Sequence, residues 1–234
     1  MLQTLAIFFF ATLIRATFGF GDALIAMPLL SLSLGVKMAT PLFALVATSS
    51  ALAIFVSTWS AIDFKAARQL FIASLIGIPI GLLLLKIVPE SLVLRILGGF
   101  LVLFGLYRLI GAKLPDLKSP LWGYLFGFIA GVLGGAYNTN GPPIITYATL
   151  RRWPPEQFRA TLQGYFFPTG LAIAASHGLS GLWTLQIFQL YLAALPAVLS
   201  ATFIGSKIHQ KLSPKRFERL LFLLLIVLGV RLAV

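Results

Sequence analysis

The sequence predicts an all-α membrane protein with several membrane-spanning helices. Hydrophobic residues make up 59% and charged residues 10% of its 234 residues, and the mean hydropathy of +0.98 is far above the range of soluble globular domains. Apolar runs recur along the whole chain, and most approach the ~20 residues that a helix needs to cross a bilayer. No interval between these runs could fold as a separate soluble domain, so one transmembrane domain, residues 1–234, is expected.

The first half of the chain contains five apolar segments, separated by glycines, prolines and charged residues. The expected helices are Leu2–Phe18, Asp22–Leu34, Ala39–Trp59, Ala66–Ile87 and Ser91–Ile110. The second of them is too short to span a membrane, because about 13 residues at ~1.5 Å per residue extend only roughly 20 Å. Pro79 predicts a kink in the fourth helix.

The second half repeats this order after a polar link, Gly111–Pro120. Its expected helices are Leu121–Gly135, Pro142–Leu150, Glu156–His177, Leu182–Ile208 and Phe217–Val234. In both halves a helix, a break and a short helix precede three longer helices, which indicates two repeats, residues 1–112 and 119–234.

The distribution of Lys and Arg predicts how these helices cross the membrane. If each broken helix forms a hairpin with its short partner, thirteen basic residues lie on one face and four on the other, whereas a single broken span gives eleven and six. The positive-inside rule therefore favours the hairpin. Three further crossings per half invert the second repeat relative to the first, as in many secondary transporters. Both termini are then expected outside the cytoplasm of an inner-membrane protein.

The second break lies within GVLGGAYNTNGPPIITYATL, residues Gly131–Leu150, and is the most polar interval in an apolar region. Irregular backbone at membrane depth is tolerated only against protein or a wet cavity. The side chains of Asn138, Thr139 and Asn140, with the free N–H groups at the start of the helix expected from Pro142, are suited to bind an anion. Alternatively, these side chains only satisfy the broken backbone.

The first break, FGFGDALIAMPLL (Phe18–Leu30), is weaker and contains Gly21 and Asp22. Arg15 precedes it inside the first apolar segment, and a charge at membrane depth costs at least ~2.5 kcal/mol, so it usually faces a cavity or a partner. Alternatively, Arg15 marks a helix end and extends to the interface. Asp22 starts the short helix and is expected to pair with Arg15 or to cap the helix, with proton coupling as the third role open to it.

Further along, Arg159 and Gln163 are four residues apart and hence on one helix face. They could close the cytoplasmic side of the same site, although Arg159 could equally be a surface anchor. His177 and His209 are expected at the interface rather than in a catalytic site. The predicted substrate-binding residues are therefore Arg15, Gly21, Asp22, Asn138, Thr139, Asn140, Gly141, Arg159 and Gln163.

Several functions are disfavoured by the composition. The chain has no cysteine, only two widely separated histidines, and none of the motifs of nucleotide-driven pumps or hydrolases, so no metal, no cofactor and no enzymatic activity are expected. The net charge of +12 falls mostly in short loops between apolar runs, which is typical of a protein in a lipid bilayer and not of one that binds nucleic acid.

Three segments resemble the signatures of the TauE/SafE family of sulfite and organosulfonate exporters. They are GFGDALIAMPLL (Gly19–Leu30), GGAYNTNGPPIITY (Gly134–Tyr147) and FRATLQGYFF (Phe158–Phe167). Asp22 departs from the pattern, because Gly commonly fills that position. The resemblance implies a carrier of sulfite, sulfoacetate or related anions that is driven by an ion gradient.

These observations together predict a secondary active transporter of a small anion that works by alternating access. H+ or Na+ is the expected coupling ion, and homodimer formation is left open. The alternatives are an anion channel or facilitator that uses the same polar breaks, and an intramembrane enzyme that acts on lipid.

Overall fold

The structure, a computed structural model, describes residues 1–111 and 117–209 together with 222–223, 226–227 and 229–230, and every regular element in these ranges is helical. The helices of the first half are α1 (Leu2–Phe18), α2 (Asp22–Leu34), α3 (Val36–Thr58), the short 3-10 helix η1 (Trp59–Ala61), α4 (Phe64–Ile87) and α5 (Glu90–Ile110). Those of the second half are α6 (Trp122–Tyr137), α7 (Gly141–Leu150), α8 (Pro155–Leu179) and α9 (Leu185–His209).

The helix ranges expected from the sequence are confirmed for these nine α-helices of the described part. The bounds of α1 and α2 agree to the residue, and the others differ by at most three residues at either end. Apolar runs mark these helices because a lipid-facing helix must be apolar along its whole length. The last expected helix, Phe217–Val234, lies largely outside the described residues.

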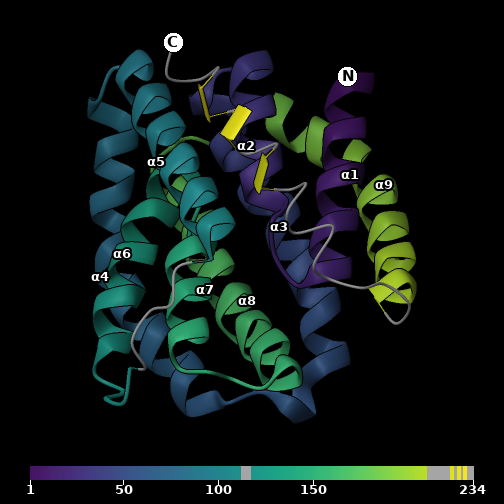
Figure 1. Cartoon of the computed structure of the whole chain (residues 1–234). Coiled ribbons are helices and arrows are strands. Elements are labelled where there is room, and N and C mark those ends of the chain that lie inside the picture. Colours follow the sequence, from purple (N-terminus) through teal and green to yellow (C-terminus); the bar gives the residue numbers. More distant parts are fainter. Residues whose placement is uncertain (112–116, 210–221, 224–225, 228, 231–234) are drawn as a thin grey trace.

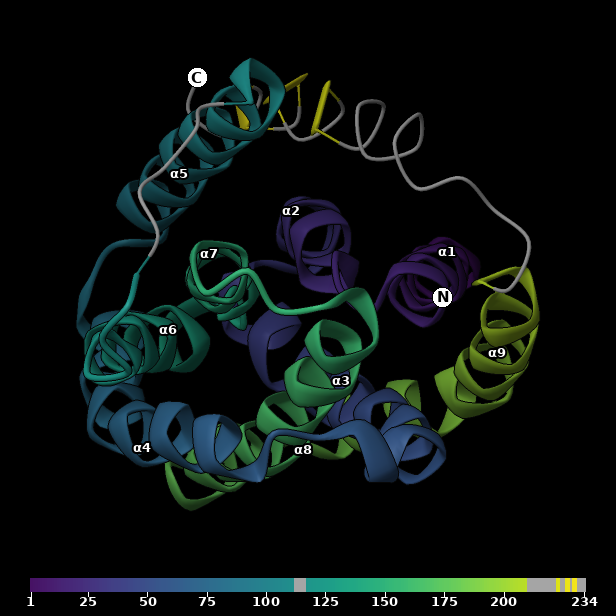
Figure 2. The same ribbon diagram turned by 60° about the horizontal axis from the view of Figure 1, so that its bottom comes forward.

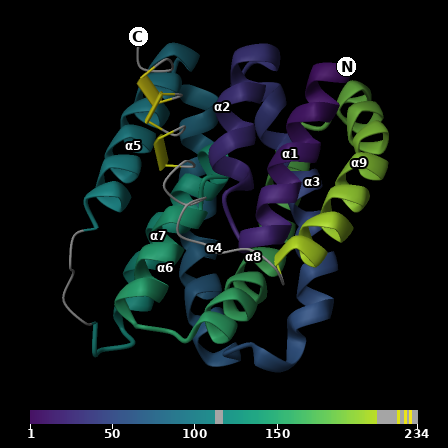
Figure 3. The ribbon, with the colours of Figure 1, turned by 45° about the vertical axis from the view of Figure 1, so that its right-hand side comes forward.

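Each broken helix folds back on its short partner. α1 leads away from the N-terminus and α2 returns beside it, so that Phe8 and Leu30 meet in one apolar cluster (Figure 1). In the second half, the N–H of Leu117, just before α6, donates to the carbonyl of Leu150 at the end of α7 over 3.0 Å. The two hairpins enter from opposite faces of the protein (Figure 3).

The short helices α2 and α7 lie in the middle of the bundle, with the longer helices around them (Figure 2). Among the described residues, three helical segments are long and apolar enough to cross a membrane: Val36–Ala61, Phe64–Ile87 and Leu185–Ile208. Many large hydrophobic side chains on the outer helices are exposed, such as Ile76 at 65% and Phe203 at 63%. These features define a multi-pass helical membrane protein.

Basic residues separate towards the two ends of the bundle. Lys65, Gln69 and Arg151 share a polar cavity with Pro120, and Arg151 Nη1 donates to the carbonyl of Lys118 over 2.6 Å. At the opposite end, Lys86 Nζ donates to the carbonyl of Ser180 over 3.1 Å. Lys65, Lys118 and Arg151 thus lie at one end of the bundle and Lys86 at the other. The count of Lys and Arg in the sequence assigned them to the same two faces.

Glycines allow α4 and α6 to pack closely enough for their backbones to touch. A Cβ added at Gly131 of α6 would lie 2.3 Å from the carbonyl oxygen of Ser74, and one added at Gly77 of α4 would lie 2.3 Å from that of Phe128. The Ser74 hydroxyl also donates to the carbonyl of Gly127 over 2.7 Å. Inside a bilayer the hydrophobic effect does not drive helices together, because the lipid tails are as apolar as the side chains. Close packing of small residues and interhelical hydrogen bonds hold the helices together instead. This contact therefore fixes the position of α6 before the second break.

We predict that Gly131→Ala lowers the stability of the protein by about 1–3 kcal/mol, because the new methyl group meets backbone that cannot yield. The matched control is Gly99→Ala in α5, where an added Cβ has no neighbour within 4 Å. Its greater helix propensity should raise stability by up to ~1 kcal/mol. Thermal unfolding of the purified variants in detergent measures both effects. Equal melting temperatures for the two variants would contradict the packing described for α4 and α6.

Candidate functional site

Both helix breaks contribute walls to one enclosed cavity. Its volume is about 40 Å³, enough for roughly three water molecules. The first break contributes Phe20 to Leu24, and the second contributes Asn138 and Asn140 to Pro142. Arg15 of α1 and Ile145 of α7 also line it, as do residues of α3 and α8: Phe43, Ala44, Ala47, Phe166, Gly170 and Ile173. The two breaks, more than a hundred residues apart in sequence, thus meet at one place inside the protein.

The first break is a tight reversal between α1 and α2. Gly19 has φ of 87° and Gly21 has φ of 101°, a region that side chains rarely adopt. The N–H of Gly19 closes α1 by donating to the carbonyl of Arg15 over 2.6 Å. Gly21 is the N-cap of α2, and no side chain caps this helix. The first N–H groups of α2 therefore begin at the cavity wall, where they favour negative charge.

Arg15 is buried at the end of α1 and does not extend to the interface. It is 4% exposed, and its Nη1 lies 2.6 Å from Oδ2 of Asp22, which is 7% exposed. Nη2 donates to Oε1 of Gln163 over 3.2 Å, and the guanidinium carbon lies 5.1 Å from the ring centre of Phe166. Of the roles weighed for Asp22, the pairing with Arg15 is observed and a side-chain cap of α2 is not.

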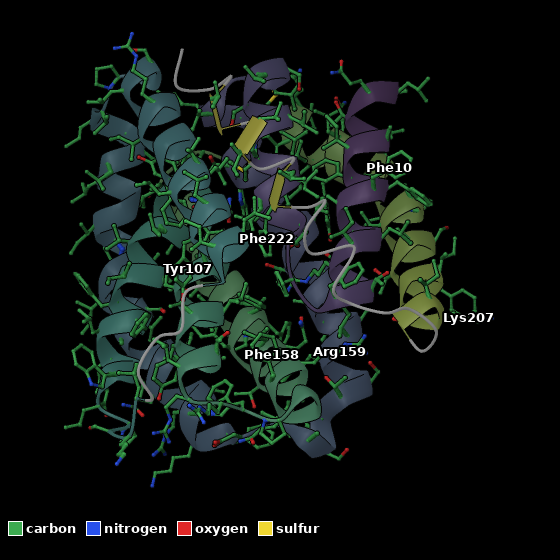
Figure 4. All side chains as sticks on the ribbon, in the orientation of Figure 1. Phe10, Tyr107, Phe158, Arg159, Lys207 and Phe222 are labelled. Carbon is green, nitrogen blue, oxygen red and sulfur yellow. The ribbon has the colours of Figure 1, made fainter. Side chains whose placement is uncertain are left out.

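Gln163 and Arg159 hold the end of α1 from the neighbouring helix α8. Gln163 Nε2 donates to the carbonyl of Gly19 over 2.7 Å. Arg159, labelled in Figure 4, donates from Nη2 to the carbonyl of Ala16 over 3.0 Å. Both side chains thus point from one face of α8, as their spacing predicts. A cation at a helix C-terminus also interacts favourably with the helix dipole. Neither side chain lines the cavity; they support the wall that Arg15 forms.

The second break is held by Asn138 at the end of α6. Asn138 has φ of 55°, and its Nδ2 donates to the carbonyl of Thr40 in α3 over 2.6 Å. The N–H groups of Asn138 and Thr139 turn back to the carbonyls of Gly134 and Leu133, at 2.9 and 3.3 Å. This is the pattern by which a left-handed residue ends a helix. The amide group of Asn138 therefore binds protein backbone.

The start of α7 offers fewer backbone donors than the sequence suggested. The helix begins at Gly141, and the next two residues, Pro142 and Pro143, have no N–H. On this side the half-buried side chain of Asn140 lines the cavity and lies beside the buried hydroxyl of Tyr165. The Tyr165 hydroxyl is in turn 2.8 Å from that of Ser74 on α4.

Six of the nine predicted site residues line the cavity: Arg15, Gly21, Asp22, Asn138, Asn140 and Gly141. Arg159 and Gln163 lie behind Arg15. Thr139 is fully buried, is absent from the lining, and its hydroxyl has no hydrogen-bond partner. The apolar walls from α3 were missed, since nothing distinguishes Phe43 or Ala44 from any other residue of an apolar helix. Phe166 and Gly170 were also missed, although Phe166 lies within the segment Phe158–Phe167.

His177 lies in the last turn of α8, and its side chain is fully buried. Its Nε2 lies 3.2 Å from the carbonyl oxygen of Gly135, and Nδ1 is buried without a partner. It lies one helical turn beyond Ile173, whose side chain lines the cavity. In the described part of the chain, no three His, Cys, Asp or Glu side chains gather closely enough to hold a metal ion.

A multi-pass bundle whose two hairpins enclose a small polar cavity has the architecture of a membrane transport protein. Comparison with known families agrees with this class. The family model described as Sulfite exporter TauE/SafE matches residues 4–232, and the chain belongs to this family of membrane transporters.

Three curated relatives are membrane proteins with similar names. A probable sulfite/organosulfonate exporter TauE of Cupriavidus necator is 26% identical over 73% of this chain and 68% of its own length. A probable inner membrane transporter protein TsaS of Comamonas testosteroni is 26% identical over 67% and 66%. A probable membrane transporter protein YunE of Bacillus subtilis is 22% identical over 84% and 80%. No solved structure matches the chain.

We predict that Gln163→Leu destabilises the protein by about 1–3 kcal/mol, because it leaves the buried Gly19 carbonyl without a donor. Gln69→Leu is the matched control, since its exposed bond to the Pro120 carbonyl should cost less than about 1 kcal/mol. Thermal unfolding in detergent gives both values. If Gln163→Leu were as stable as Gln69→Leu, the proposed support of the first break by α8 would be wrong.

Proposed function

We propose that the chain is a secondary active transporter of a small sulfur-containing anion, either sulfite or an organosulfonate such as sulfoacetate. The observation that carries the proposal is the position of Arg15, a buried cation in the wall of a cavity that both helix breaks share. Buried cations inside membrane proteins typically mark a substrate path or a partner. The family and the name of the Cupriavidus relative support the sulfur-containing class.

The chemistry of the cavity suits a compact oxyanion. Arg15 offers further N–H groups, including an Nε that is buried without a partner, and charged donors form the stronger hydrogen bonds to anions. The N-terminus of α2 and the side chain of Asn140 supply neutral donors from two other sides. A cavity of about 40 Å³ favours sulfite over a longer organosulfonate in this conformation.

The arrangement of the two halves supports a transport cycle by alternating access. We propose that residues 1–112 and 119–234 are inverted repeats, since their hairpins enter from opposite faces and meet at the cavity. Pro79 within α4 and Pro196 within α9 are places where long helices can bend during the exchange between states. The face with Lys65, Lys118 and Arg151 is the cytoplasmic one in an inner membrane, which places both termini on the other side.

A test of the site must remove the charge of Arg15 without leaving Asp22 buried and unpaired, which alone destabilises a protein by about 3–5 kcal/mol. The double variant Arg15→Gln with Asp22→Asn meets this requirement. We predict that it loses sulfite flux in proteoliposomes by at least about tenfold, a loss of ~1.4 kcal/mol in binding or more. Asn140→Ala, which removes a donor on the opposite wall, should also lower the flux.

The matched control is Arg68→Gln, because Arg68 is exposed and lies outside the cavity. Its flux should equal that of the wild type. Unchanged flux in both the double variant and Asn140→Ala would refute the site. A secondary transporter should move the anion against its own concentration gradient when an ion gradient is imposed. If the anion only ever flows down its own gradient, the protein is a channel.

A further inference from the structure

We infer that Asp22 binds a proton when the anion binds, and that the protein therefore moves one proton together with each monovalent anion. The inference rests on the proposed function and extends it to the coupling ion. It depends on the ion pair between Asp22 and Arg15. The Asp22 carboxylate already binds the guanidinium group with which a substrate anion would pair.

The empty cavity is electrically balanced. Arg15 Nη1 and Asp22 Oδ2 are 2.6 Å apart, and the side chains are only 5% and 10% exposed. Among the described residues that line the cavity, these two are the only charged ones. The site thus carries one positive and one negative charge before any substrate enters.

An anion that pairs with Arg15 leaves the Asp22 carboxylate without its cation. Among the described residues that line the cavity from other elements, none offers a replacement cation. α3 contributes Phe43, Ala44 and Ala47 to the cavity, and the second break contributes the neutral Asn138 and Asn140.

On α8, Gln163 is neutral, and the cation of Arg159 donates to the Ala16 carbonyl at 3.0 Å and is not part of the lining. A buried charge that has lost its partner costs several kcal/mol. Protonation removes this cost: a proton from water forms an O–H bond on the carboxylate, and the anion takes its place beside Arg15.

The exchange keeps the net charge of the site at zero. Arg15 and ionised Asp22 balance in the empty carrier, while Arg15 and a monovalent anion balance in the loaded carrier, with Asp22 neutral. A carrier must change between its two openings both with and without substrate, and a charge in a low-dielectric interior is costly to move. Because both states are neutral, neither has to move a net charge. Binding of the proton and the anion then strengthen each other by the same factor.

The coupling is tested by counting protons during binding to the purified full-length protein. Isethionate, an organosulfonate that stays ionised, and sulfite are added to the protein in weakly buffered detergent solution with a pH indicator. Wild-type protein should take up about one proton more per bound anion than Asp22→Asn does. Its anion affinity, from thermal stabilisation, should fall by up to about tenfold per unit rise in pH, the slope of one linked proton.

Asp22→Asn leaves Arg15 buried and unpaired in the absence of anion, so its melting temperature should fall. The anion should still bind and raise it, now independently of pH, because Asn imitates the protonated carboxyl of the loaded state. Asp63→Asn is the matched control: Asp63 is a carboxylate outside the cavity that caps α4, and Asn caps equally well. It should keep the proton uptake of the wild type.

Binding without proton uptake in the wild type, equal uptake in Asp22→Asn, or loss of binding in Asp22→Asn would each overturn the coupling. If neither anion stabilises the wild type, the proposed function itself fails, and the coupling fails with it.

Discussion

The whole arrangement depends on one constraint: a helix that breaks at membrane depth exposes backbone groups that lipid cannot satisfy. Each break in this protein finds its partners on another helix. Gln163 and Arg159 of α8 bind carbonyls at the end of α1, and Asn138 binds a carbonyl of α3. These contacts hold α3 and α8 against the breaks. The cavity therefore exists because the same helices that satisfy the backbone also enclose the space between the two hairpins.

The helices and both breaks could be predicted from the sequence, because apolar length and interruptions by Gly, Pro and Asn are local signals. The pairing of Arg15 with Asp22 was also foreseeable, since the two lie close in the chain. The walls from α3 were not, because Phe43 and Ala44 differ in no local way from lipid-facing residues. The burial of His177 was missed for a similar reason: its partner, the Gly135 carbonyl, lies on a different helix. The sequence also shows that Pro142 and Pro143 have no N–H group to donate. The polar residues before them nevertheless led to the prediction of free N–H donors at the start of this helix.

Contacts between the two halves are of two kinds. α4 and α6 touch through backbone at Gly77 and Gly131. Such a contact tolerates little sliding of one helix along the other. By contrast, Arg15 and Gln163 meet through side chains 148 residues apart, at 3.2 Å. A hydrogen bond of this type can break and form again at small cost when water or an anion replaces one partner. Motion between the halves is therefore easier at the cavity than at the glycine contact.

The two prolines at the start of α7 have a consequence for how substrate preference can diverge within the family. On the α2 side, the neutral donors are backbone N–H groups, which no single substitution removes except one to proline. On the α7 side, Pro142 and Pro143 lack these groups, and the side chain of Asn140 lines the cavity beside them. A side chain can be exchanged by one mutation without changing the course of the chain. The chemistry of the α7 wall therefore depends on an exchangeable side chain, whereas the α2 wall keeps its backbone donors under any substitution except one to proline.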